Sequence, residues 1–371
     1  MVKSKFFPAL AVLVGTTIGA GFLGIPYVIS KSGFIPGAIL LVFVAALILL
    51  VKLYLGEIDL RTKQTCQLTG YAKRYLGKKG KVLMFLAMVL GIYSALTAYL
   101  LAEGKSLSLL VFGNFNYSFL LSIVFWIALC FWSYIGLKAL KKYEKIGMFI
   151  ILALMLLILV FFTGKIDTGN LSYVNKGNLF LPFGVILFSF LAFSAMPEVG
   201  RILSKQENLT KKVVFLGVLI PLVVYLLFSL VVVGVFGLQV NEIATLSLGR
   251  FFSLLGILTM FTAYFTLSLA IRDMFRFDFG FGRFKGWLLA SLVPLALFFI
   301  ISKLNLVGFI DILSFGGIVS GGLTGILVLL MNRKAKLLGN RKPEYSVMIN
   351  WWIITIISLI FIAAVVAEFV F

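Results

Sequence analysis

The sequence contains no histidine and only two cysteines, Cys66 and Cys130. Without histidine, the chain has no imidazole to bind a metal, act as a general base or relay a proton. Cys66 falls in a basic segment and Cys130 in an apolar one, so the pair gives no sign of a disulfide framework. Charged residues are also scarce, at 12%, whereas 62% of the residues are hydrophobic. A soluble globular domain has about 25% charged residues, so this composition excludes that class.

The acidic residues are few as well, with 13 in the whole chain. They are scattered and form no paired-carboxylate motif, and no glycine-rich lysine loop of the nucleotide-binding type is present. A membrane-embedded enzyme needs acids, histidines or metal ligands that face one another. We therefore predict that the chain is not an enzyme, needs no cofactor and does not use ATP by itself.

Long apolar runs are present instead, many of the length of about 18 or more residues that crosses a bilayer core as a helix. They lack the alternation typical of an outer-membrane β-barrel. We predict an all-α membrane protein with eleven transmembrane helices. Their expected ranges are 8–31, 33–56, 82–104, 118–137, 146–164, 179–203, 213–237, 249–275, 286–302, 306–332 and 347–370.

The basic residues lie mostly on one side of these eleven helices. Of the 33 lysines and arginines, 26 fall on the side that holds the N-terminus and 6 on the other. Basic residues concentrate on the cytoplasmic loops of membrane proteins. We therefore predict a multi-pass protein of the cell membrane with a cytoplasmic N-terminus and an extracellular C-terminus. The same rule accounts for the net charge of +20 without any nucleic acid partner.

The first predicted helix contains the segment Gly15–Pro26, with four glycines and a proline. Glycine weakens a helix and proline removes a backbone donor, so we predict local unwinding in mid-membrane. Unwound backbone is tolerated there only where it lines a cavity or is buried in protein. Its free amides favour a carboxylate and its free carbonyls favour an ammonium group or a cation, a combination that matches an amino acid. The alternative is that the glycines only allow close helix packing.

The sixth predicted helix contains a similar interruption, Phe188–Glu198, with a proline and small polar residues. It comes five helices after the first, and because five is odd, two consecutive five-helix units must run in opposite directions. Interrupted segments at matching positions of inverted halves indicate the central site of a transporter. We predict this site between Thr17–Phe22 and Phe188–Phe193, where the phenylalanines would form an apolar wall for a neutral or hydrophobic substrate.

The segment Gly15–Tyr27, GTTIGAGFLGIPY, resembles the first helix of amino acid permeases of the amino acid–polyamine–cation superfamily. The nearest branches are the amino acid/auxin permeases and the tryptophan/tyrosine permeases. Tyr71–Lys81 is similar to their basic loop after the second helix, and Phe309–Thr324 is similar to their tenth helix. Tyr99, after Ala98, stands where those permeases often keep a tyrosine near the pocket.

The resemblance implies a LeuT-like fold and secondary active transport by alternating access. In this chain the two inverted five-helix repeats would span about 6–165 and 177–335, with 347–370 as an extra helix of one transmembrane domain, 1–371. The backbone of Ile18–Phe22 would hold the substrate's carboxylate and amino groups, completed by carbonyls near Phe188 and Ser189. The substrate site implied in full is Thr17, Ile18, Gly19, Ala20, Gly21, Phe22, Tyr99, Phe188, Ser189, Phe190 and Phe193.

The resemblance also implies a place for a coupling ion. Sodium-coupled relatives hold the ion between first-helix carbonyls, here those of Gly15 and Ile18, and hydroxyls of the eighth helix, here that of Thr262. Ala263 stands where a second hydroxyl is common, which puts sodium in question. Thr266, one turn further along, is the candidate substitute.

Ionisable residues inside a membrane are costly and are functional candidates by default. Glu198 follows the second interruption and is a candidate carrier of a coupling proton. The alternatives for it are an ion pair with Arg201 or simple exposure near the inner surface. Lys52 is expected to extend to the inner surface, and Asp311 is expected to cap the start of a helix.

We therefore expect a symporter of neutral, hydrophobic or aromatic amino acids, driven by a proton or sodium gradient. A non-transporting membrane sensor of amino acids on the same fold is the alternative. The sequence leaves open the particular amino acid, the ion, the direction of flux and the oligomeric state.

Overall fold

The computed structural model describes residues 4–64, 66–135, 140–304 and 307–370, and the regular structure within these ranges is helical. Among these residues, seven helices are long and apolar enough to cross a membrane, and the bent pair Phe6–Thr17 and Ala20–Ser32 makes an eighth. Three shorter apolar helices accompany them: Ser118–Tyr134, Ile150–Lys165 and Trp351–Ala367. Each of the eleven predicted segments thus overlaps one of these apolar segments of the structure, although positions 136–137 and 306 of those predictions lie outside the described residues.

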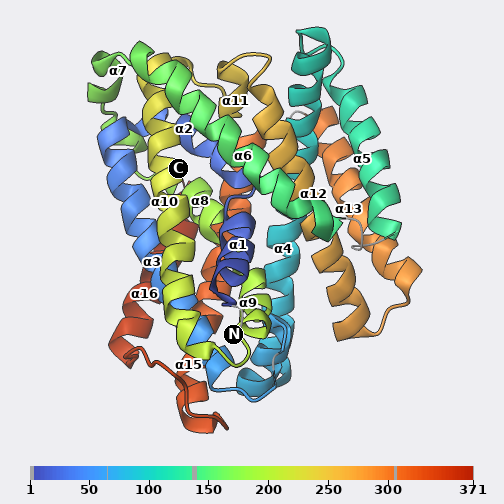
Figure 1. The fold of residues 1–371 in the computed structure, drawn as a ribbon, viewed down its shortest axis with the longest axis vertical. Helices are drawn as coiled ribbons and strands as arrows, with labels where there is room; N and C mark the ends of the chain where they lie inside the picture. Colours follow the sequence, from blue (N-terminus) through green and yellow to red (C-terminus); the bar gives the residue numbers. More distant parts are fainter. Residues whose placement is uncertain (1–3, 65, 136–139, 305–306, 371) are drawn as a thin grey trace.

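The helices carry the labels of Figure 1 in chain order. The first part of the chain forms α1 (Phe6–Thr17), the 3₁₀ turn η1 (Ala20–Gly24), α2 (Ile25–Ser32), α3 (Phe34–Leu60), α4 (Leu68–Phe112), α5 (Ser118–Ile135), α6 (Leu140–Phe162) and α7 (Thr168–Ser172). The rest forms α8 (Pro182–Phe190), the 3₁₀ turn η4 (Phe193–Ala195), α9 (Met196–Ile202), α10 (Thr210–Phe236), α11 (Ala244–Ser247), α12 (Ser253–Phe279), α13 (Arg283–Leu304), α14 (Phe309–Phe315), the π-helix η7 (Gly316–Gly321), α15 (Gly322–Leu338) and α16 (Trp351–Val370).

The first membrane helix is interrupted where the sequence predicts it. α1 ends at Thr17, Gly19 is extended with φ −80° and ψ −158°, and the two parts of the helix are bent by 41°. α2 then begins with Pro26 in its first turn. Proline is favourable at that position, because the missing N–H would have no intrahelical acceptor there. The same short segment therefore both ends one helix and starts the next.

The sixth membrane segment is interrupted in a similar way. α8 ends at Phe190, and Ala192 adopts a left-handed conformation with φ 34°. This conformation costs an alanine about 1–2 kcal/mol, so the surrounding packing must hold the break in place. α9 restarts with Pro197 in its first turn, which repeats the arrangement at Pro26.

The last long segment is also irregular, which was not predicted. The residues expected to form one helix, 306–332, are divided among α14, the π-helix η7 and α15. The glycines of η7 pack tightly on other helices. A Cβ on Gly317 would overlap the carbonyl oxygen of Gly184 on α8, and a Cβ on Gly316 would lie 2.8 Å from the Cβ of Ser94 on α4. The glycines therefore let η7 lie directly against α4 and α8, next to the breaks.

Two helices extend beyond their predicted limits. α3 continues to Leu60, and α4 begins well before the predicted start and bends at Gly77, where φ is 75°. The interpretation of Tyr71–Lys81 as a loop was therefore wrong. This segment is amphipathic at helical spacing, with Tyr71 and Tyr75 buried and Arg74 exposed, and such a pattern stabilises a helix against the rest of the bundle.

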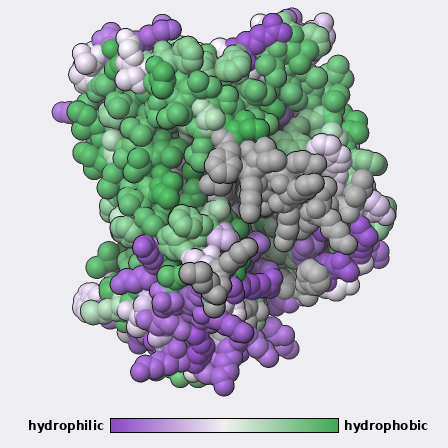
Figure 2. Space-filling view, in the orientation of Figure 1, coloured by the Kyte–Doolittle hydropathy of each residue, from purple (hydrophilic) through white to green (hydrophobic). Residues whose placement is uncertain are grey.

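α1 lies in the middle of the bundle, between α10 and α4 in the view of Figure 1. On the face shown in Figure 2, hydrophobic residues cover most of the upper and middle parts, and hydrophilic residues are concentrated at the lower end. The N-terminus, α9 and the end of α15 lie at this lower end (Figure 1). The distribution is the one expected of a helical bundle that sits in a bilayer.

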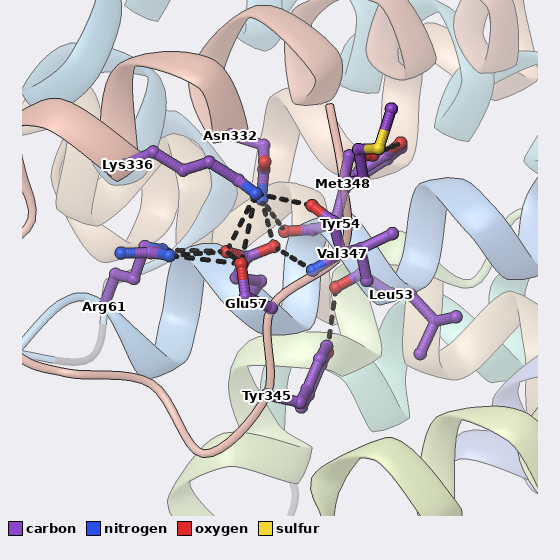
Figure 3. Close-up of polar contacts among 10 residues, drawn as sticks. Leu53, Tyr54, Glu57, Arg61, Asn332, Lys336, Tyr345, Val347 and Met348 are labelled. Carbon is purple, nitrogen blue, oxygen red and sulfur yellow. Dashed lines mark hydrogen bonds and ion pairs between the residues drawn. The ribbon is translucent and has the colours of Figure 1, made fainter. Parts of the chain in front are cut away.

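The buried carboxylate of Glu57 on α3 binds the connector between α15 and α16 (Figure 3). It accepts hydrogen bonds from the hydroxyl of Ser346 at 2.8 Å and from the backbone N–H of Val347 at 3.0 Å. It also forms ion pairs with Arg61 at 2.8 Å and Lys336 at 3.6 Å. Because the charge is paired and hydrogen-bonded, it can remain buried, and it holds the ends of α3 and α15 together.

Candidate functional site

The two interrupted helices border one cavity of about 550 Å³. This volume is within the range of about 300–1,000 Å³ that small-molecule sites occupy. α4, α6, α12 and the region of η7 and α15 complete the wall. The aromatic residues Tyr99, Phe188, Phe193 and Phe261, from α4, α8, η4 and α12, line it, as do Ser320 of η7 and Thr324 of α15. These two hydroxyl residues were missed in the sequence.

Most of the predicted site residues come together at this cavity. Those of the first interrupted helix and of α4 are Gly15, Thr17, Ile18, Gly19, Gly21 and Tyr99, and those of α8, η4 and α12 are Phe188, Ser189, Phe193, Thr262 and Thr266. They lie far apart in the sequence, so only the fold brings them together. The cavity is therefore the candidate substrate site.

Three predicted substrate residues lie behind the wall instead of lining it. Phe22 and Phe190 are fully buried, and their ring centroids lie 5.7 Å and 5.1 Å from that of Tyr225 on α10. Ala20 is fully buried as well. These side chains support the breaks from behind, and only their backbone is available to the predicted site.

Glu198, the predicted carrier of a coupling proton, is exposed in the first turn of α9. It does not line the cavity. It also forms no ion pair with Arg201 in the part of the chain that the structure describes. Of the alternatives considered for this residue, exposure is the one observed.

The glycines of the first break have two different roles. A Cβ on Gly19 would meet only ordinary contacts, with the nearest side chain that of Ala263 at 3.8 Å, and a Cβ on Gly15 would meet nothing within 4 Å. A Cβ on Gly21, in contrast, would lie 2.8 Å from the ring of Phe188. Gly15 and Gly19 thus border open space, whereas Gly21 allows the two interrupted helices to touch.

Tyr225 on α10 connects the two breaks and was not predicted. Its hydroxyl lies 2.7 Å from the carbonyl oxygen of Thr17 and 3.1 Å from that of Ser189, and it is buried. Carbonyls at helix ends lack intrahelical donors, so one phenol that donates to both stabilises two helix ends at once. The available signal in the sequence is a tyrosine within the apolar run of the seventh predicted helix.

Lys52 on α3 is fully buried, with 0% of its side chain exposed, and its ammonium group donates a hydrogen bond to the hydroxyl of Thr17 at 3.2 Å. The prediction that it extends to the inner surface was wrong. The reason is the length of α3, which continues to Leu60. About 12 Å of helix lies beyond Lys52, at 1.5 Å per residue, and the side chain cannot snorkel that far.

The residues proposed for a sodium ion would supply carbonyl and hydroxyl oxygens as its ligands. Gly15, Ile18 and Thr262 all line the cavity. The Thr262 hydroxyl lies 3.0 Å from the carbonyl oxygens of both Leu258 and Thr259, to which it donates, so its lone pairs remain available to a cation. No group of three or more histidine, cysteine or acidic side chains suited to a metal occurs among the described residues. Sodium binding here stays a prediction.

Interrupted helices around one cavity, within an apolar helical bundle, are the features of a membrane transporter. The sequence matches the model of the tryptophan/tyrosine permease family over residues 2–247, and the chain belongs to this family. The relationship predicted from Gly15–Tyr27 is thereby confirmed.

Curated relatives support the same class of protein. Glutamine transporter 2 of Aliivibrio fischeri is 25% identical over 250 residues, which are 66% of this chain and 64% of the relative. Tyrosine-specific transport system 2 of Haemophilus influenzae is 29% identical over 248 residues, 63% of this chain and 59% of the relative. The chain thus matches less than two thirds of the length of either relative. Both relatives are named as transport proteins.

Proposed function

We propose that this protein is a secondary active transporter of amino acids that works by alternating access. The observation that supports this most strongly is that two interrupted helices border one cavity and are joined by Tyr225. Transporters built from inverted repeats bind their substrates between such helices. The named relatives transport glutamine or tyrosine, which supports an amino acid as the substrate class.

The proposed architecture is the LeuT-like one, with inverted repeats over about 6–165 and 177–335 and with 347–370 as an eleventh helix. Each repeat would then begin with an interrupted helix. The proline in the first turn of both α2 and α9 supports this correspondence. The excess of basic residues on one side supports a cytoplasmic N-terminus and an extracellular C-terminus.

The site suits a zwitterion with an apolar or aromatic side chain. The start of η1 presents backbone amides that attract a carboxylate, and the end of α1 presents carbonyls that attract an ammonium group. Phe188, Phe193 and Phe261 provide an apolar wall for the side chain. The proposed substrates are therefore neutral, hydrophobic or aromatic amino acids, moved together with a proton or a sodium ion.

Solute counterflow separates this function from that of a non-transporting sensor. Proteoliposomes are loaded with unlabelled tyrosine, tryptophan or glutamine and diluted into the labelled amino acid. A transporter concentrates the label transiently inside without any ion gradient, and protein-free liposomes do not. Saturable binding of the label without counterflow would favour the sensor, and the absence of both would reject amino acids as the ligand class.

A further inference from the structure

Lys52 is the only lysine or arginine that is buried among the side chains that the structure describes. It lies on α3, and its partner is the hydroxyl of Thr17, the residue with which α1 ends. Thr17 in turn lines the cavity and donates its own hydroxyl proton to the carbonyl of Leu13 at 2.7 Å. A single hydroxyl therefore separates a buried amine from the candidate substrate site.

Among the residues that the structure describes, no carboxylate forms an ion pair with this amine. α3 packs against α2, α7, α8, α9, α10 and α15. The titratable and charged residues of these helices and of α3 itself are Tyr27, Lys31, Tyr54, Glu57, Asp59, Glu198, Arg201, Lys211, Lys212, Tyr225, Arg333, Lys334 and Lys336. None of the three acids among them forms an ion pair with Lys52.

Each of these acids is engaged or placed elsewhere. Glu57 is bound by Arg61 and Lys336. Asp59 accepts a hydrogen bond from Tyr71, and Glu198 is exposed. An isolated ammonium group in such surroundings is expensive to keep charged, so a nearby negative charge would change its protonation equilibrium strongly.

We propose that Lys52 carries the coupling proton of this transporter, an inference that rests on the proposed function. A substrate carboxylate bound at the first break would lie near the amine and favour its ammonium form. By linkage, the protonated protein must then bind the substrate more tightly, by the same factor. The two stable states would then be the ammonium form with substrate bound and the neutral amine with the site empty. A protein that exchanges between these two states on opposite sides of the membrane moves a proton and an amino acid together, which is symport.

The proton moves through Thr17. In the structure the Thr17 hydroxyl donates to Leu13 and accepts from Lys52, so with a neutral amine it would first turn its O–H toward Lys52. From the side with the higher proton concentration, a hydronium ion in the cavity then gives a proton to the Thr17 oxygen, the original hydroxyl proton passes to the Lys52 amine, and water remains. On the other side the steps reverse after the amino acid leaves, with the ammonium losing one proton to water. One proton and one amino acid thus cross together, and no bond to carbon changes.

A second buried ionisable group, Glu103 on α4, provides the contrast. It is 1% exposed, and both of its carboxyl oxygens lack a hydrogen-bond partner. It does not line the cavity, and within the described residues no hydroxyl is hydrogen-bonded to it as that of Thr17 is to Lys52. Glu103→Gln is therefore the matched control variant, in which a buried ionisable side chain is removed without any effect on the proposed coupling.

The test measures labelled amino acid binding as a function of pH, together with counterflow and proton-driven accumulation in proteoliposomes. In the wild type, affinity should rise as pH falls. Lys52→Met removes the charge and should bind weakly at all pH values, whereas Lys52→Arg keeps a permanent charge and should bind tightly at all of them. Both variants should retain counterflow but lose proton-driven accumulation by at least about tenfold, a typical size of coupling between two sites.

The outcomes separate this inference from the proposed function. Proton-driven accumulation that survives in Lys52→Met or Lys52→Arg would overturn the inference about Lys52. Loss of proton coupling in Glu103→Gln but not in the Lys52 variants would also overturn it, and so would accumulation that is driven by a sodium gradient only. If one variant fails to fold, the other decides. If the wild type shows no counterflow, the proposed function fails, and pH-independent binding by the wild type would still reject the role of Lys52.

Discussion

The hydroxyl of Tyr225 donates a hydrogen bond to the carbonyl oxygen of Thr17 at a distance of 2.7 Å. This contact joins α10 to the end of α1, at the break of the first interrupted helix. The same hydroxyl also donates to the carbonyl oxygen of Ser189, near the break of the second interrupted helix. The two breaks are therefore not independent irregularities, since one side chain fixes both of them relative to a third helix.

The first prediction concerns this side chain. Tyr225→Phe keeps the ring contacts with Phe22 and Phe190 but leaves two buried carbonyls without this donor. Such a loss costs about 1–3 kcal/mol, so we expect a lower melting temperature in detergent and weaker substrate binding. Tyr54→Phe, which removes the hydrogen bond to Met348 away from the cavity, is the control and should affect stability alone. Unchanged substrate binding in Tyr225→Phe would show that the hydrogen bonds of Tyr225 do not shape the site.

The second prediction separates the glycines. Gly19→Ala has room for its methyl group and should fold with a nearly unchanged melting temperature, but the methyl group borders the cavity and should weaken substrate binding. Gly21→Ala forces the Phe188 ring to move, and overpacking of this kind costs about 1–3 kcal/mol. Both variants are compared by thermal unfolding and by binding of labelled amino acid. A Gly19→Ala protein that binds normally would contradict the site assignment.

The third prediction concerns the buried carboxylate in Figure 3. Glu57→Gln leaves Arg61 and Lys336 without their shared partner, and breaking a buried ion pair costs about 3–5 kcal/mol. We expect a strongly destabilised protein whose folded fraction still exchanges substrate. The control is Glu344→Gln, which removes the exposed ion pair with Arg341 and should cost only about 0–1 kcal/mol. Equal melting temperatures for the two variants would mean that Glu57 does not hold the connector.

Both breaks were predictable because glycine and proline act through the backbone, which leaves a local signal in the sequence. The roles of individual glycines were not, because Gly19 and Gly21 differ only in what lies opposite them: open cavity for one and the Phe188 ring for the other. Packing of this kind depends on helices far apart in the chain.

Lys52 shows why the remaining part of the site could not be predicted. A lysine near the expected end of an apolar run is normally placed at the membrane surface. Its actual depth depends on where α3 ends, and its orientation depends on α1 packing beside it. Tyr225 presents the same difficulty, because a tyrosine in an apolar run can serve packing alone. Both residues acquire a role only through partners that the sequence does not place next to them.

The most direct test of the central claim is the accumulation of labelled tyrosine, tryptophan and glutamine in proteoliposomes with an inward proton gradient, an inward sodium gradient or neither. The account predicts that at least one of these amino acids accumulates above its external concentration under the proton gradient, and that a protonophore abolishes this accumulation. Equilibration to the external concentration under every condition, with the protein folded and the amino acid bound, would contradict secondary active transport.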